Sequence, residues 1–289
     1  MGSRERIEQD LAELSEAIAA LNLEFRNTYE GYLTALGQTT RQQLILACYH
    51  LCTQVAPESF LKLSFAGRQK MQQSARSLAI ASQAKLRSLL TEAEAESDIE
   101  SESENDEKSE SEIEEDSDFL AIDDREPETN NQLSAANSPE SLARWQDSIE
   151  KSIVNILKLL SRDTNRLLQQ SGILPQQLPE PVLAAASAAD SSGESVAGPP
   201  NLLSLIIETN DSSDSASLGE TRGTNPIHIT AIKLRLSEIE FADADTSAWR
   251  QQIRNLSARL NSIGRDYQKK QRELAVVEAE SAWRSSWFE

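Results

Sequence analysis

The 289-residue chain is acidic, with a formal net charge of −19, and only 38% of its residues are apolar. Residues 92–118 carry fifteen acidic side chains against one lysine, whereas residues 1–91 carry ten basic and eight acidic ones. An acidic chain is a poor match for a phosphate backbone, so a nucleic-acid partner is disfavoured. Because no apolar run approaches membrane-spanning length, we expect a cytoplasmic protein with no membrane partner.

The first predicted element is a long helix with an apolar residue at every third or fourth position. This spacing is typical of a helix that packs lengthwise on another helix. The seam consists of Ile7, Leu11, Leu14, Ile18, Leu21, Phe25 and Tyr32. Gly37 is expected to end the helix, because glycine readily adopts the left-handed conformation that follows a last turn.

Three further helices complete a predicted N-terminal helical module, residues 1–91. The second would be capped by Thr39 or Thr40 and end before Pro57, which would open the short third helix. The fourth would run from about Phe65 to Leu90. Residues 59–91 hold six basic side chains and no acidic one: Lys62, Arg68, Lys70, Arg76, Lys85 and Arg87. On one continuous helix these would be spread around the surface and would form no single stripe.

Residues 92–137 are predicted to be a disordered acidic linker. The run "ESDIESESENDEKSESEIEEDSD" has many like charges and almost nothing to bury, so it cannot offset the entropy lost on ordering. We expect it to separate two folded modules and to keep them soluble.

The C-terminal module, residues 138–289, is predicted to begin with Ser138 as a helix cap and Pro139 at the first helical position. The seam of this helix consists of Leu142, Trp145, Ile149, Ile153, Ile156, Leu160 and Leu167. Gly172 should end the helix. A Pro/Ser/Gly-rich insertion follows at about 173–225, and two stretches in it, "EPVLAAASAA" and "NLLSLIIE", are candidate short helices.

Two more helices are predicted after the insertion. The first would begin with Asn225 as its cap and Pro226 as its first residue, and the second would run from about Ser247 to the C-terminus. At 1.5 Å per residue the final helix would be roughly 60 Å long. A compact domain cannot bury the whole seam of such a helix, so part of it should project or pair with another chain.

The sequence ends in "SAWRSSWFE", which places Trp283 and Trp287 on one helical face. Exposed tryptophan beside arginine is typical of binding hot spots, so a docking motif is one interpretation. The other is an internal latch that pins the end of the long helix onto the bundle. The candidate partner-binding residues are Trp249, Tyr267, Trp283, Arg284, Trp287 and Phe288.

The sequence offers little for catalysis or metal binding. Cys48 and Cys52 share a helical face, but His50 points almost the opposite way and His228 is distant in sequence. Zinc usually needs four such ligands, and buried cysteine commonly acts as a small apolar side chain. The chain has no phosphate-binding loop, nucleophile elbow or dinucleotide fingerprint. We therefore expect no metal, no cofactor and no enzymatic activity.

Two passages, "YLTALGQTTRQQLILACYHLCTQVAP" (32–57) and "LRLSEIEFADADTSAWRQQIRNLSARL" (234–260), together with the ending "EAESAWRSSWF", resemble uncharacterised hypothetical helical proteins of cyanobacteria. The resemblance covers the two helical modules and not the acidic linker. It implies a cytoplasmic bacterial setting and no particular activity.

The sequence therefore predicts an all-α protein with coiled-coil-like seams. The favoured function is a non-catalytic adaptor or scaffold that binds protein partners by helix–helix association, with homo-oligomerisation through the long helices as one mode. One alternative is a regulatory protein whose basic helix at 62–87 contacts nucleic acid. Another is an assembly chaperone whose acidic linker occupies a basic surface on a client protein.

Overall fold

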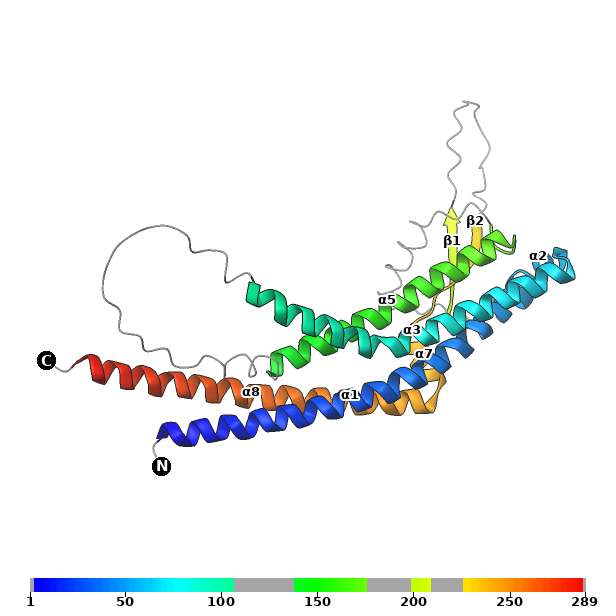
Figure 1. Ribbon diagram of the computed structural model, residues 1–289. Coiled ribbons are helices and arrows are strands. Elements are labelled where there is room, and N and C mark those ends of the chain that lie inside the picture. The colour runs from blue at the N-terminus through cyan, green and yellow to red at the C-terminus, as the bar shows by residue number, and fades with distance from the viewer. Residues whose placement is uncertain (1–2, 107–137, 176–198, 209–225, 288–289) are drawn as a thin grey trace, which may run out of the picture. The chain divides into compact units, whose positions relative to one another are not determined.

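The computed structural model describes residues 3–106, 138–175, 199–208 and 226–287 (Figure 1). Its elements are α1 (Ser3–His50), the π-helical turn η1 (Leu51–Val55), α2 (Pro57–Lys62), α3 (Phe65–Asp106), α5 (Pro139–Gln170), β1 (Leu202–Glu208), β2 (Pro226–Ile232), α7 (Leu236–Ala242) and α8 (Ala244–Ser286). The protein is thus mostly helical, as the sequence predicts. Among these residues, no helix is long and apolar enough to cross a membrane.

Two compact units divide the chain. The first takes Met1–Leu33, Ser88–Ser152 and Ala248–Glu289, and the second takes Thr34–Arg87 and Ile153–Ser247. The helices α1, α3, α5 and α8 each contribute to both units. Each unit therefore combines segments from the predicted N-terminal and C-terminal modules.

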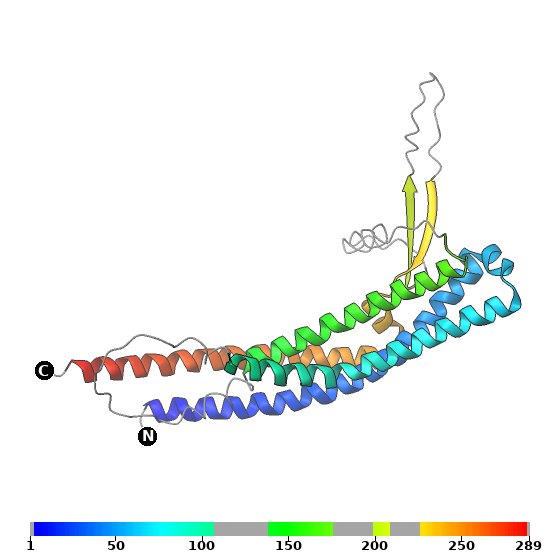
Figure 2. The same ribbon diagram turned by 45° about the horizontal axis from the view of Figure 1, so that its top comes forward.

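In the first unit, α1 and α8 lie side by side and run in opposite directions (Figures 1 and 2). Their paired side chains are Arg4 with Glu278, Asp10 with Lys270, and Glu24 with Arg259. Residue numbers therefore rise along α1 as they fall along α8, which defines one antiparallel register.

The seams predicted for α1 and α8 form the core of this unit. The side chains of Ile18, Leu21 and Phe25 on α1 are buried, as are those of Ile253 and Leu260 on α8. This burial follows from the three–four spacing, which keeps the apolar residues on one stripe of each helix.

The helix α5 also packs antiparallel to α8 in the first unit. Gln146 donates a hydrogen bond to Ser257 over 2.8 Å, and the Gln268 amide donates to Glu140 over 2.9 Å. The predicted start of α5 is confirmed, because the backbone N–H of Ser141 donates to the Ser138 hydroxyl. The helix ends before Gly172, whose φ of 74° is the left-handed conformation expected there.

The predicted end of the first helix at Gly37 is wrong, because α1 continues to His50. In the second unit Gly37 lies against α3, and a Cβ atom there would be 3.1 Å from Gln83 Cγ and 3.5 Å from Gln83 Cα. The glycine thus allows α3 to approach closely. After His50 the chain forms the π-helical turn Leu51–Val55, and α2 then begins at Pro57.

The predicted boundary between helix and acidic linker also differs from the structure. The helix α3 continues to Asp106, so it covers the first part of the segment predicted to be disordered. Residues 91–95 read "TEAEA", and alanine and glutamate are good helix formers, which explains the extension. The remainder of the predicted linker, 107–137, lies outside the described residues.

The largest correction concerns the insertion and the helix predicted after it. The apolar run predicted as a short helix at 201–208 is the strand β1, and residues 226–232 form β2 instead of the start of a helix. The two strands pair antiparallel, with Leu202 opposite Ile232 and Glu208 opposite Pro226. Isoleucine occurs twice in β1 and three times in β2, which also contains Thr230, and β-branched side chains favour a pleated strand. The candidate helix "EPVLAAASAA" lies outside the described residues.

Two asparagines hold the base of this hairpin in the second unit. The Asn165 amide donates to the carbonyl of Ile232 and accepts from its N–H, both at 2.8 Å, so it pairs with β2 as a neighbouring strand would. Asn201 is fully buried with a φ of 60°, and its side chain bonds Gln43 and the backbone of Arg235. Asparagine tolerates this left-handed conformation better than most residues.

Candidate protein-docking site

The two terminal tryptophans lie on the exposed surface of α8. Trp283 is 66% exposed and Trp287 is 74% exposed. Their rings stack with centroids 5.5 Å apart and an interplanar angle of 27°. Arg284 lies beside them and pairs with Glu280 one turn earlier. The side-by-side arrangement expected from the four-residue spacing is therefore present, and both rings face solvent.

The register of the first unit explains this exposure. Arg4, in the first turn of α1, faces Glu278 on α8. Residues 279–286 continue α8 beyond that point and are all exposed. The internal-latch interpretation predicted that Trp283 and Trp287 would be buried, whereas both are exposed in the structure. We call this exposed end, residues 279–287, the α8 tip.

The other candidate aromatics lie within the helical bundle. Tyr267 is buried in the first unit, and Trp249 is half-buried against Gly31 of α1. A Cβ atom on Gly31 would lie 2.6 Å from the Trp249 ring, so the glycine makes room for the indole. Phe288 lies outside the described residues. The five described candidates thus separate into Trp249 and Tyr267 within the bundle and Trp283, Arg284 and Trp287 at the α8 tip.

A partly buried polar network, not found from the sequence, joins three helices of the first unit. Arg250 on α8 donates to both carboxylate oxygens of Glu150 on α5, over 2.6 and 3.0 Å. It also donates to the Tyr32 hydroxyl of α1 over 2.7 Å, and the Tyr29 hydroxyl donates to Glu150 over 2.7 Å. Burial, followed by the charge of Glu150, raises the pKa of Tyr29 well above its usual range. The network therefore keeps Tyr29 protonated as a hydrogen-bond donor.

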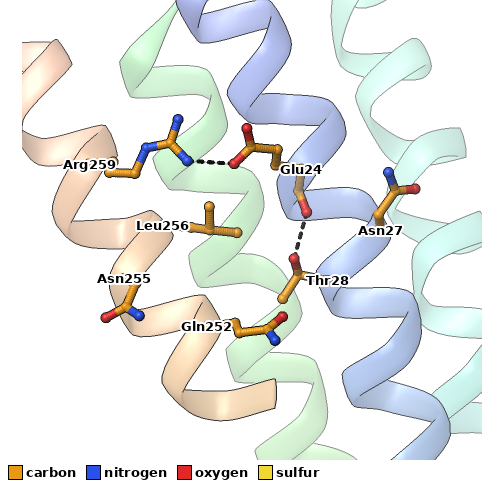
Figure 3. Close-up of a pocket in the computed structure, with 7 residues that line it drawn as sticks. All are labelled: Glu24, Asn27, Thr28, Gln252, Asn255, Leu256 and Arg259. Carbon is orange, nitrogen blue, oxygen red and sulfur yellow. Dashed lines mark hydrogen bonds and ion pairs between the residues drawn. The ribbon is translucent and has the colours of Figure 1, made fainter. Parts of the chain in front are cut away.

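A shallow pocket of about 350 Å³ lies between α1 and α8 in the first unit (Figure 3). Its lining consists of Glu24, Asn27, Thr28, Gln252, Asn255, Leu256 and Arg259. Glu24 and Arg259 pair with each other across it at 2.5 Å, and Thr28 donates to the backbone carbonyl of Glu24. The two charged side chains of the lining, Glu24 and Arg259, therefore neutralise each other.

Both cysteines are free and buried. Burial raises the pKa of Cys48 to about 12 and that of Cys52 to about 11. At neutral pH the thiols are therefore protonated, and a protonated thiol is a poor nucleophile and a poor metal ligand. In the described part of the chain, no group of three histidine, cysteine or acidic side chains is placed to hold a metal ion.

The described residues thus define a mostly helical protein with an exposed aromatic helix end. Neither a known family model, nor a curated protein, nor a solved structure matches this chain.

Proposed function

We propose that this chain is a non-catalytic helical adaptor and that the α8 tip binds a protein partner by helix–helix association. The observation that carries the proposal is the exposed, stacked pair of Trp283 and Trp287. Tryptophan is the side chain most enriched at interface hot spots, and two of them on one face form a continuous apolar surface.

The energetics favour burial of this pair in a complex. A tryptophan contributes roughly 150–250 Å² of contact area, and about two-thirds of each ring is free here. At about 25 cal/mol per Å², covering both rings contributes about 6 kcal/mol before the cost of association. Because the pair already stacks on a helix, little side-chain entropy remains to be lost on binding.

The experiment compares affinity capture from source lysate by the full chain and by a Trp283→Ala/Trp287→Ala variant. The matched control is Leu23→Ala/Phe241→Ala, which removes two exposed apolar side chains elsewhere. Sedimentation velocity of each purified chain tests self-association, and circular dichroism tests equal helicity.

We expect a captured protein, or a self-associated species, that disappears only in the double tryptophan variant. Identical captured proteins and identical sedimentation for all three chains would refute the proposal. A loss of helicity in the tryptophan variant would assign the aromatics a structural role instead.

A further inference from the structure

We propose that the corner between α2 and α3, residues 60–70, attaches the protein to the surface of an anionic lipid bilayer. This α2–α3 corner belongs to the second unit and is independent of the α8 tip. Both ribbon views show α2 at the turn that joins α1 to α3 (Figures 1 and 2).

Two large apolar side chains of the corner lie in solvent. Leu61 at the end of α2 is 65% exposed, and Phe65 at the start of α3 is 80% exposed. Val55, two residues before α2, is exposed as well. Single exposed apolar residues are common, but several within one turn region indicate an interaction surface.

The corner is held in a defined conformation by Arg68. Its guanidinium donates to the carbonyls of Leu61 and Leu63, each over 3.0 Å, and lies over the Phe60 ring at 5.7 Å. The Ser64 hydroxyl also accepts the N–H of Gly67. Because these bonds fix the turn, the outward positions of Leu61 and Phe65 belong to the folded corner.

The charge of the region selects an anionic partner. Lys62 and Lys70 are both exposed beside the apolar pair. Within residues 60–70 the charged side chains are Lys62, Arg68 and Lys70, all basic, and the one acidic side chain of α2 is Glu58, just before the corner. Each lysine or arginine close to an anionic membrane strengthens binding by about fivefold.

The combination of apolar and basic groups favours a lipid surface over nucleic acid. A phosphate backbone would pair with Lys62 and Lys70 but would leave Leu61 in water. A lipid interface accepts apolar side chains below its headgroups, while the flexible lysine side chains keep their charges at headgroup level. The lack of a membrane-spanning run concerns insertion across a bilayer and does not bear on attachment to its surface.

The test is flotation of the full chain with phosphatidylcholine vesicles, with and without phosphatidylserine, at low and high salt. We expect flotation only with phosphatidylserine and a marked loss at high salt, because salt screens the lysines. Leu61→Ser/Phe65→Ser should weaken the partition at least about tenfold through loss of buried apolar area. Lys62→Gln/Lys70→Gln should weaken it about 25-fold at low salt.

Matched controls separate the corner from general charge and hydrophobicity. Phe241→Ser removes another highly exposed aromatic, and Lys151→Gln/Lys158→Gln removes two exposed lysines of α5. Both should float as the unmodified chain does, and circular dichroism should show equal helicity for all.

Three results would overturn the inference. The first is the absence of flotation with phosphatidylserine vesicles. The second is equal flotation of the corner variants and their controls. The third is retention of single-stranded RNA that requires the two corner lysines but not the two apolar residues, which would assign the surface to nucleic acid.

Discussion

Replacing Arg250 with methionine removes a guanidinium group from the first unit but keeps a side chain of similar length. Glu150 then retains only the Tyr29 hydroxyl among the partners of its network. The carboxylate side chain is 26% exposed and cannot recover full hydration in place. We therefore expect Arg250→Met to lower the free energy of unfolding substantially.

The geometry sets the magnitude. Arg250 makes two parallel hydrogen bonds to Glu150 and one to Tyr32, and it lies 4.7 Å from the centroid of the Tyr32 ring. Removing one partner of a buried ion pair costs about 3–5 kcal/mol. Because the side chains of Arg250 and Glu150 are 13% and 26% exposed, we expect a loss near the lower end, about 3 kcal/mol.

The assay is urea unfolding followed by circular dichroism, within a double-mutant cycle. Urea is chosen because guanidinium chloride would screen the ion pair. Glu150→Gln should cost about 2 kcal/mol, since the amide still accepts from Tyr29 but gives Arg250 no counter-charge. The Arg250→Met/Glu150→Gln chain should lose less than the sum, with a coupling of about 2 kcal/mol.

An exposed ion pair between α1 and α8 provides the control. Arg259 and Glu24 are 56% and 48% exposed, so Arg259→Met should cost less than about 1 kcal/mol. Two results would contradict this reasoning: an Arg259→Met cost as large as that of Arg250→Met, or a coupling of zero between Arg250 and Glu150. Either would show that burial does not strengthen the Arg250–Glu150 pair.

Three further changes have expected outcomes in the same unfolding assay. Gly31→Ala should cost about 1–3 kcal/mol, because the new Cβ would lie 2.6 Å from the Trp249 ring, and adding Trp249→Leu should restore part of the loss. Asp243 accepts bonds from a hydroxyl and an N–H in the first turn of α8, which lower the pKa of its carboxyl. Asp243→Ala should cost about 1 kcal/mol. Wild type should lose the benefit of that charge as pH falls below about 4, whereas Asp243→Asn should show no such loss. The pKa values of Cys48 and Cys52 lie above the unfolded value of 9.0, so folded thiols stay protonated while unfolded ones ionise. The free energy of unfolding should therefore fall between pH 9 and 11, by at most about 1.4 kcal/mol per pH unit for each thiol, and Cys48→Ala/Cys52→Ala should remove that slope.

The long helices could be predicted because their signal is local. The three–four spacing that includes Ile18, Leu21 and Phe25 identifies the buried stripe without knowledge of its partner. Gly37 could not be interpreted in the same way. Its role depends on Gln83 of α3, which approaches it in space, and a stop and a close approach look alike in sequence.

The hairpin was missed for a related reason. A short apolar run that follows a proline fits either the first turn of a helix or a strand, and periodicity over a few residues does not separate them. The strand β2 is paired along its length with β1, and its last residue, Ile232, also bonds Asn165 from 67 residues away. The spacing of residues in the sequence does not reveal the contact between Asn165 and Ile232.

The candidate site shows the same division between local and distant information. The stacking of Trp283 on Trp287 follows from their four-residue spacing. Their exposure does not, because it depends on the register of α8 against α1, in which Arg4 faces Glu278. The network of Tyr29, Glu150 and Arg250 joins residues that are 121 and 100 positions apart in the sequence, and no motif marks it.

The buried network and the α8 tip are connected through the register of the first unit. Apolar seams repeat along a helix, so α1 and α8 could also pack with a shift of one repeat. Arg250 of α8 donates to Tyr32 of α1 and to Glu150 of α5, and these bonds form in only one alignment of the three helices. A polar group at such a seam can select a single register. In that alignment Arg4 faces Glu278, and the helix beyond it is left exposed.

Exposure of the α8 tip should therefore depend on a polar network that lies far from it along the same helix. Spin labels at Arg4→Cys and Glu278→Cys, in a chain without the native cysteines, should give one short distance by double electron–electron resonance. Adding Arg250→Met/Glu150→Gln should broaden that distribution, because only the repeating apolar seam would then set the alignment. An unchanged distribution would show that the seam alone fixes the register, and the overhang of the tryptophans would then follow from apolar packing.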